Sequence, residues 1–125
     1  MKVKVSELIG AALDWAVAKV EGGTDPWHDT IATWWITLDY KDRALRKGWA
    51  QSFCPSTDWA HGGPILDKMF AEYQFGYEDG EYFVGNPGLY LYGPTSLVAA
   101  MRCLVASELG NEIEVPDELV GAVPA

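Results

Sequence analysis

The chain has 125 residues, which at about 100 to 200 residues per domain predicts one domain with a single core. Apolar residues make up 49% of the sequence and charged residues 22%, a composition that excludes the disordered and collagen-like classes. Nine Lys and Arg residues stand against eighteen Asp and Glu residues, for a formal charge of −9. Because this charge repels a phosphate backbone, the composition argues against general nucleic-acid binding.

The N-terminal segment resembles a signal peptide only in outline. Lys2 and Lys4 precede an apolar stretch, but Glu7 and Asp14 interrupt it. The most apolar later stretch, residues 97–106, is far shorter than the ~20 residues needed to cross a bilayer. We therefore expect a cytoplasmic protein without a membrane partner.

Cysteine and histidine are both scarce. Cys54 and Cys103 are too few for a disulfide framework, so we expect two reduced, packed thiols. His28 and His61 lie far apart in sequence, and a composite site from Cys54, Asp58 and His61 lacks a fourth ligand. The sequence therefore predicts no metal site, and without a P-loop or dinucleotide fingerprint it predicts no cofactor.

The first half of the chain predicts one helix and two strands. Helical periodicity favours an amphipathic helix with Ser6 as its N-cap, ending at Gly22-Gly23. Residues 31–40 are rich in β-branched and aromatic residues and predict a strand, which leaves Trp35 on its polar face. Residues 41–47 are expected to be a charged connection and residues 48–54 a second short strand. The core face of the first strand is predicted to carry Ala32, Trp34, Ile36, Leu38 and Tyr40.

The second half predicts a loop, a short helix, a hairpin and a third strand. Residues 55–63 are dense in turn-forming residues, and a short helix is expected to begin near Pro64. Residues 73–77 and 81–84 flank the turn Glu78-Asp79-Gly80, which is typical of a hairpin. The turn Asn86-Pro87-Gly88 then precedes a strand over residues 89–92.

The strongest helix signal follows this strand. Gly93-Pro94-Thr95 opens a helix that runs to Glu108 or Leu109 and is closed by Gly110. Its two apolar faces predict two packing partners: the sheet, and either the first helix or a second subunit. The predicted fold is α+β, with a small antiparallel sheet packed against N-terminal and C-terminal main helices and one short helix. Residues 1–110 form this single domain, and residues 111–125 are an acidic, extended tail.

Three separated blocks of the sequence are VSELIGAALDWAVAKVEG at 5–22, CPSTDWAHGGPIL at 54–66 and YGPTSLVAAMRCLVASELGNEIEVPDEL at 92–119. In this order they resemble the NinX-like family of small proteins from tailed phages and prophages. Residues 24–50 and 68–91 match no pattern of the family that can be stated. The resemblance implies a phage accessory protein in the cytoplasm of a host cell, and it brings no activity or site residue with it.

The loop before the short helix also contains residue types found in nucleophilic sites. Cys54, Ser56, Thr57 and His61 lie close together in sequence. No nucleophile-elbow motif accompanies them, and Ser, Thr and Asp before a helix are common turn and cap formers. We therefore predict no catalytic residue and no enzyme, with a hydrolase built on residues 54–61 as the third hypothesis.

Aromatic residues are more numerous than one small core requires, with six Trp, six Tyr and four Phe. Their faces are rigid platforms for flat ligands or partner side chains. Trp35, Tyr90 and Tyr92 are predicted to point away from the core face of their strands. They either belong to a second sheet face that is also covered, or form a stacking wall in a pocket or subunit interface. Arg102, which interrupts an apolar helix, is either a cation for an anionic ligand or an edge residue with its head in water.

The loop and its glycines complete the predicted site. Ser and Thr hydroxyls would add polar specificity, and glycines at a helix start would let an anion approach free N–H groups. The predicted ligand-binding residues are Ser56, Thr57, Asp58, Trp59, Gly62, Gly63, Trp35, Tyr90, Tyr92 and Arg102.

The leading hypothesis is a homo-oligomeric phage accessory protein that binds a small anionic or nucleotide-like ligand without catalysis. Sequestering a host defence signal, an anti-defence role, is one form of it. The alternative is an acidic protein–protein interaction module that binds a host or phage protein.

Overall fold

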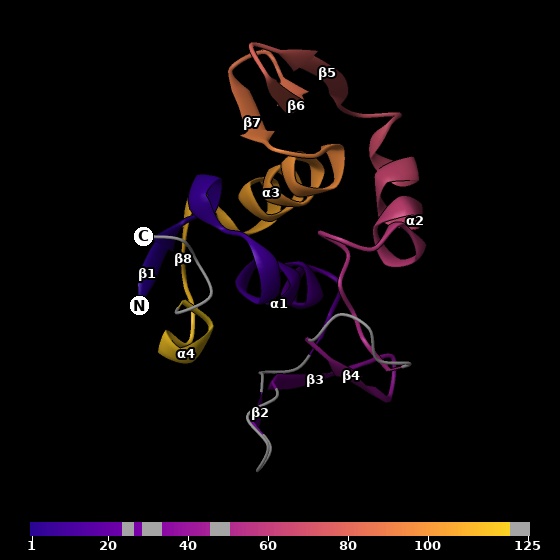
Figure 1. The fold of residues 1–125 in the computed structure, drawn as a ribbon, viewed down its shortest axis with the longest axis vertical. Helices are drawn as coiled ribbons and strands as arrows, with labels where there is room; N and C mark the ends of the chain where they lie inside the picture. Colours follow the sequence, from indigo (N-terminus) through magenta and orange to yellow (C-terminus); the bar gives the residue numbers. More distant parts are fainter. Residues whose placement is uncertain (24–26, 29–33, 46–50, 121–125) are drawn as a thin grey trace.

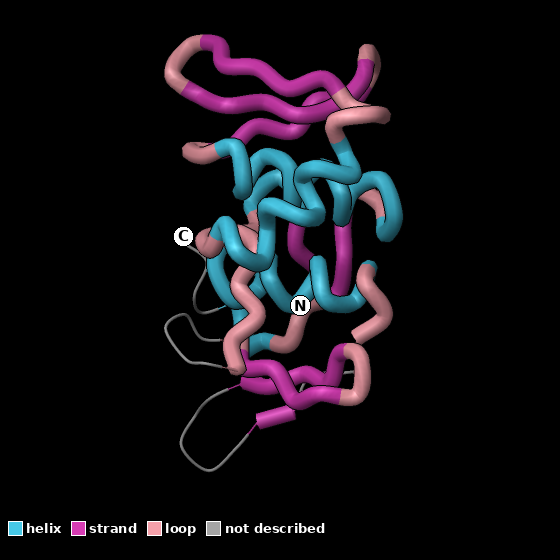
Figure 2. The backbone as a smooth tube through the Cα atoms, turned by 90° about the vertical axis from the view of Figure 1, so that its right-hand side faces the viewer, coloured by secondary structure: helices cyan, strands magenta, loops and turns pink. Residues whose placement is uncertain are grey.

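The computed structural model describes residues 1–23, 27–28, 34–45 and 51–120 (Figure 1). The predicted α+β class is confirmed. The described strands form three separate antiparallel sheets rather than one, in the orders β1-β8, β2-β3-β4 and β5-β6-β7. Figure 2 shows a layer of helices between the β2-β3-β4 sheet at one end and the β5-β6-β7 sheet at the other. The helices of this layer are α1 (Gly10–Val20), α2 (Trp59–Met69) and α3 (Ser96–Leu109).

Helix α1 begins later than predicted. Val5–Glu7 forms a separate 3-10 turn, η1, and Ser6 makes no cap, so the predicted N-cap is wrong. The reason is burial: Val5 and Leu8 are both packed in the core, and extended backbone at Leu8 separates the turn from the helix. The predicted end is confirmed, because Gly22 adopts the left-handed φ of 92° just beyond the helix.

Helix α2 begins earlier than predicted. Asp58 caps it, its Oδ1 accepting a hydrogen bond of 2.9 Å from the Ala60 N–H. Pro64 therefore lies inside the helix rather than at its start. Proline favours the first turn of a helix, but the Asp58 cap, six residues before Pro64, starts α2 earlier.

Helix α3 was predicted correctly. Thr95 caps its start through a hydrogen bond to the Val98 N–H, and Gly110 ends it with a φ of 95°. One side of α3 packs on β6 and β7 and another on α1. The first helix therefore supplies the second packing partner without a second subunit.

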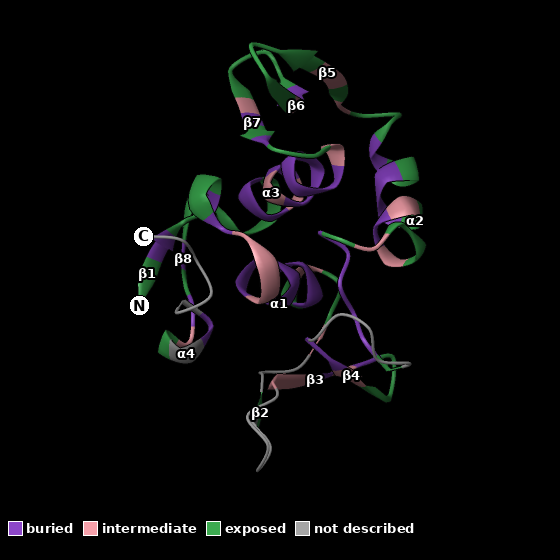
Figure 3. Ribbon diagram, viewed as in Figure 1, coloured by how far each residue is buried: buried purple, intermediate pink, exposed green. Residues whose placement is uncertain are grey.

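The β5-β6-β7 sheet also follows the prediction. It consists of β5 (Gln74–Glu78), β6 (Glu81–Asn86) and β7 (Leu89–Gly93). Asp79 and Gly80, with φ of 53° and 84°, form the tight turn of the hairpin, and Gly88, with φ of 100°, the next turn. Figure 3 shows that this sheet is largely exposed whereas α1 and α3 are largely buried.

The β2-β3-β4 sheet differs from the prediction. It contains β2 (Trp27–His28), β3 (Trp34–Leu38) and β4 (Lys41–Ala44), so residues 41–44 of the predicted charged connection form a strand, while residues 46–47 lie outside the described part. Asp39 and Tyr40 make the turn with positive φ, and Tyr40 is fully exposed rather than in the core. Ile36 and Leu38 are buried as predicted, whereas Ala32 lies outside the described residues. Of the predicted strand at 48–54, residues 48–50 also lie outside them, and Ser52 forms only an isolated bridge to Ala44.

Residues after Gly110 belong to the fold instead of forming a separate tail. Strand β8 (Glu112–Glu114) pairs with β1 (Lys2–Lys4), which places Lys2 opposite Glu114 and Lys4 opposite Glu112. A short helix, α4 (Asp117–Val120), follows, and residues 121–125 lie outside the described part. Residues 112–115 alternate acidic and apolar side chains, which is the pattern of a half-buried strand. The prediction of a tail relied on the acidic composition and overlooked this alternation. The buried residues of this segment include Ile113, Val115 and Leu119.

No helix in the described ranges combines the length and apolar character that a membrane span requires.

Gly62 and Gly63, which are neighbours in α2, give a matched test of how this helix packs against Pro55 and Leu97. A Cβ at Gly62 would collide with the Pro55 carbonyl oxygen and lie 2.6 Å from a Leu97 methyl group. A Cβ at Gly63 would meet nothing closer than Trp59 Cε3, at 3.9 Å. We expect Gly62→Ala to lower the free energy of unfolding by about 1–3 kcal/mol, because it overpacks the site.

The same change one residue later should have the opposite sign. We expect Gly63→Ala to raise the free energy of unfolding by up to about 1 kcal/mol through helix propensity alone. Urea denaturation of both variants measures the difference. Equal effects of the two substitutions would contradict the position of α2 against Pro55.

Candidate functional site

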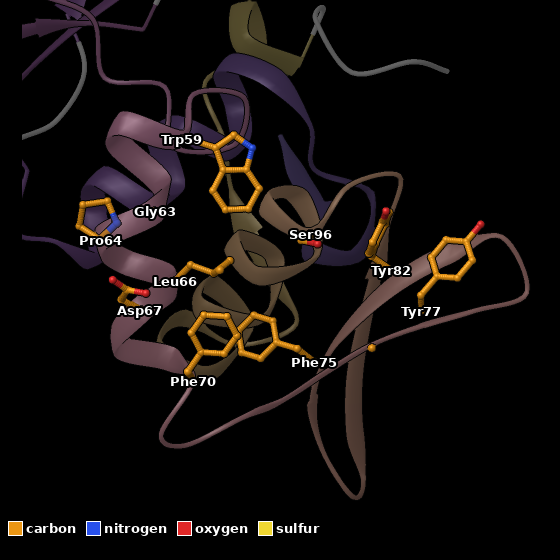
Figure 4. Close-up of a pocket in the computed structure, with 11 residues that line it drawn as sticks. Trp59, Gly63, Pro64, Leu66, Asp67, Phe70, Phe75, Tyr77, Tyr82 and Ser96 are labelled. Carbon is orange, nitrogen blue, oxygen red and sulfur yellow. The ribbon is translucent and has the colours of Figure 1, made fainter.

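A groove lies between α2 and the hairpin of β5 and β6, with a volume of about 750 Å³ (Figure 4). We call it the aromatic groove, because five of its described lining residues are aromatic. They come from α2 and its C-cap, from β5 and from β6, which follow one another in sequence. The residues that line it are Trp59, Gly63, Pro64, Leu66, Asp67, Phe70, Phe75, Gly76, Tyr77, Tyr82 and Ser96.

One wall is a face of α2. Trp59, Gly63, Asp67 and Phe70 recur at spacings of four, four and three residues, so they lie on one side of the helix. The side chains of Trp59 and Phe70 are 59% and 56% exposed, although both are large and apolar. Leu66, by contrast, is buried and contributes to the floor.

The other wall is the inner face of the hairpin. Phe75 and Tyr77 alternate onto the same face of β5, and Tyr82 lies directly opposite Tyr77 on β6. The rings of Tyr77 and Tyr82 meet edge to face with their centroids 4.9 Å apart. The rings of Phe70 and Phe75, 4.5 Å apart, join the two walls at the end where α2 leads into β5.

The lining carries a single charge among the described residues, the carboxylate of Asp67. The nearest cation in sequence, Lys68, lines a different pocket together with Glu21 and Arg43. The aromatic groove therefore offers apolar faces and one negative charge, and no positive group for a phosphate or carboxylate ligand.

Comparison with protein families matches residues 4–108 to the family described as "Bacteriophage P22, NinX". The chain belongs to the phage NinX family. The match includes the whole aromatic groove and also residues 24–50 and 68–91, where sequence inspection found no pattern. No curated protein matches the chain.

The structure brings only two of the predicted ligand-binding residues of this NinX-family chain to the aromatic groove, Trp59 and Gly63. Asp58 is the helix cap, and the Thr57 N–H donates to the Cys54 carbonyl. The Gly62 N–H donates to the Asp58 carbonyl inside the helix, so it is not a free donor for an anion. The Gly62 N–H therefore does not supply the free donor that the predicted anion site requires, and a ligand-binding role for this loop stays a prediction.

Ser56 is buried and contacts α1. Its N–H donates to Asp14 Oδ1 at 2.8 Å, and both residues are at least 97% buried. Burial raises the pKa of the Asp14 carboxyl from 3.8 to about 7, against the opposing effect of the Ser56 hydrogen bond. Ser56 therefore joins α1 to the segment that carries the cap of α2.

Two residues of the hydrolase hypothesis are held by backbone donors or are inaccessible. His61 Nδ1 accepts a hydrogen bond of 3.0 Å from the Cys54 N–H, and its ring stacks with Phe53. Ser56 Oγ is buried and has no hydrogen-bond partner among the described residues, so the imidazole does not activate it. Within the described ranges, no cluster of three or more His, Cys, Asp or Glu residues is suited to a metal ion.

The predicted stacking wall is divided between two distant surfaces. Trp35 stacks on Trp27 in the β2-β3-β4 sheet, with centroids 5.7 Å apart and planes at 11°. Tyr90 and Tyr92 flank Phe83 on the outer face of the β5-β6-β7 sheet, at 5.4 and 6.0 Å. The two sheets lie at opposite ends of the molecule (Figure 1), so these rings cannot act as one wall.

Arg102 donates hydrogen bonds to two backbone carbonyl groups. Its Nε donates to the Leu8 carbonyl at 2.8 Å, and a terminal nitrogen donates to the Tyr92 carbonyl at 2.6 Å. Burial lowers the pKa of the guanidinium, which the charge of Glu81 partly offsets. Arg102 thus ties α3 to the segment before α1 and to the end of β7.

Sequence reasoning missed most of the aromatic groove. Asp67 and Phe70 are not among the ligand-binding residues predicted from the sequence. Tyr77 and Tyr82 carried a usable signal, because they flank the predicted turn symmetrically and share one face of the hairpin. Helix α2 and β6 both pack on α3, and this tertiary packing, which no local sequence pattern reveals, places the hairpin face beside α2.

The buried Asp14 gives a prediction for the pH dependence of stability. Because the carboxyl ionises near 3.8 when unfolded and near 7 when folded, its neutral form contributes fully below about pH 4. That contribution is lost as the pH rises through about 7. We expect Asp14→Asn, which keeps an oxygen to accept from Ser56, to be increasingly more stable than the parent from pH 5 to pH 8.

Urea denaturation of the two proteins across this range measures the difference. Glu108→Gln, which removes one negative charge at an exposed position, is the control and should follow the slope of the parent. A constant difference between Asp14→Asn and the parent would contradict the raised pKa.

Proposed function

We propose that this NinX-family chain is a non-catalytic binding protein whose aromatic groove holds a segment of a partner protein. One observation carries the proposal. Of ten large hydrophobic residues that are exposed in the described ranges, four line this one groove. Clustered, exposed aromatic side chains are typical of interaction sites, where they provide most of the binding energy. The four are Trp59, Phe70, Tyr77 and Tyr82.

The shape and lining of the groove favour a protein segment over an anion. Its rings stand on two walls, so a partner side chain inserted between them would contact both α2 and the hairpin. Covering such rings removes apolar area from water at roughly 25 cal/mol per Å². A phosphate would gain no ion pair there, because Asp67 is the only charged lining residue among those described.

A small ligand is the second candidate. The volume of about 750 Å³ falls within the ~300–1,000 Å³ of small-molecule sites. An anionic or nucleotide-like ligand, such as a host defence signal to be sequestered, would stack on the rings but find no cation in the described lining. The aromatic surface therefore supports this candidate, and the charge of the lining does not.

Site-specific photo-crosslinking tests the leading proposal. A benzophenone amino acid in place of Tyr77, in cells where a phage or prophage expresses the protein, is expected to capture one partner protein. Trp59→Ala should lower the yield roughly tenfold, the effect of losing about 1.4 kcal/mol of binding energy. The adduct yield is measured by gel shift and mass spectrometry.

The matched control places the same crosslinker at Tyr40, which is fully exposed in the β3-β4 turn. Equal adduct yields at positions 77 and 40 would refute a docking role for the groove. A yield at position 77 that Trp59→Ala does not change would refute it as well. A rise in melting temperature with nucleotides or cyclic dinucleotides, lost in Trp59→Ala, would instead support the small-ligand candidate.

A further inference from the structure

We propose that the partner segment carries an arginine or lysine whose charged head binds between Trp59 and Asp67. This inference rests on the proposed function and specifies the chemistry of the partner. Trp59, Gly63 and Asp67 lie on three successive turns of one face of α2. Gly63 is about 6 Å along the helix axis from each of the other two. All three line the aromatic groove, and Figure 4 shows Gly63 between the other two along the helix.

Gly63 lies between Trp59 and Asp67 on this face of α2 and carries no side chain, and we call this position the notch. A Cβ at this position would lie 3.9 Å from Trp59 Cε3, so the indole stands beside the backbone of Gly63. Because glycine adds no side chain, position 63 does not fill the space between Trp59 and Asp67. The notch is therefore open to a group that enters from the groove.

A cation is the group that uses both sides of this notch. Aromatic faces attract a guanidinium or ammonium within about 6 Å of the ring centroid, and a carboxylate pairs with the same charge. Arginine fits best, since its flat head stacks on a ring while its N–H groups reach the carboxylate. A neutral apolar side chain would use only the ring, and an anion would be repelled by Asp67.

Charge complementarity supports the same occupant. Asp67 is exposed and makes no ion pair with any residue in the described part of the chain. The whole chain carries a formal charge of −9, which draws cationic segments toward it. Asp67 is therefore available to a positive side chain of the partner.

Two peptides of nine residues test the inference with the full chain. One alternates leucine with arginine, and the other replaces each arginine by citrulline, which has nearly the same shape and no charge. Fluorescence anisotropy of the labelled peptides measures both affinities. We expect the arginine peptide to bind roughly five- to thirtyfold more tightly, the combined size of an exposed cation–π contact and an ion pair.

Variants separate the notch from the general charge of the protein. Asp67→Asn should reduce the preference for arginine to about threefold or less. Glu108→Gln removes the same charge from the far end of α3 and should leave the preference unchanged. Equal affinity for both peptides, a preference that survives Asp67→Asn, or no binding of either peptide would overturn the inference.

Failure of this inference differs from failure of the proposed function. If both peptides bind equally and Trp59→Ala weakens both, the groove is a docking site without selectivity for a cation. If the crosslinking yield at position 77 does not depend on Trp59, the docking function itself fails, whatever the peptides show.

Discussion

The packing of α3 on opposite sides is the constraint on which the rest of the structure depends. The helix lies against β6 and β7 on one side and against α1 on the other, and none of its buried residues is aromatic. A Cβ at Gly93 would lie 2.9 Å from the Ala99 nitrogen, which shows how closely the strand end approaches the helix. Such close layers suit small and aliphatic side chains. Among the described aromatic residues, only Trp15 and Phe53 belong to the buried core.

Several of the other described rings form three groups outside the buried core. One group covers the outer face of the β5-β6-β7 sheet, where Phe83 and Tyr90 lie opposite Gly76 and Gly85 and shield them. Another is the stacked pair of Trp27 and Trp35. The aromatic groove is the group that combines exposed rings on two walls with an unpaired carboxylate. The structure accounts for the large number of aromatic residues in the sequence, because the interior is mostly aliphatic and leaves many rings outside it. These outer rings are available to form binding surfaces.

Local signals predicted the parts of the fold that local chemistry determines. The Thr95 cap, the Gly110 stop and the Asp79-Gly80 turn each act within a few residues, so α3 and the hairpin were predicted correctly. The start of α2 was missed because Asp58 and Pro64 offer competing starts. The turn at residues 39–40 was missed because neither residue is a glycine. Trp59 and Gly63 were found in the candidate site, but the hairpin that faces them is brought there by tertiary contacts.

The central claim is that the Trp59 ring is available for binding because folding does not require it. The stability of Trp59→Ala tests this claim most directly, with Leu66→Ala from the buried side of the same helix as the reference. The account predicts that Trp59→Ala changes the free energy of unfolding by no more than about 0.5 kcal/mol, as at exposed positions, while Leu66→Ala loses about 2–5 kcal/mol. A loss for Trp59→Ala as large as that for Leu66→Ala would show that the ring belongs to the core and would contradict the account.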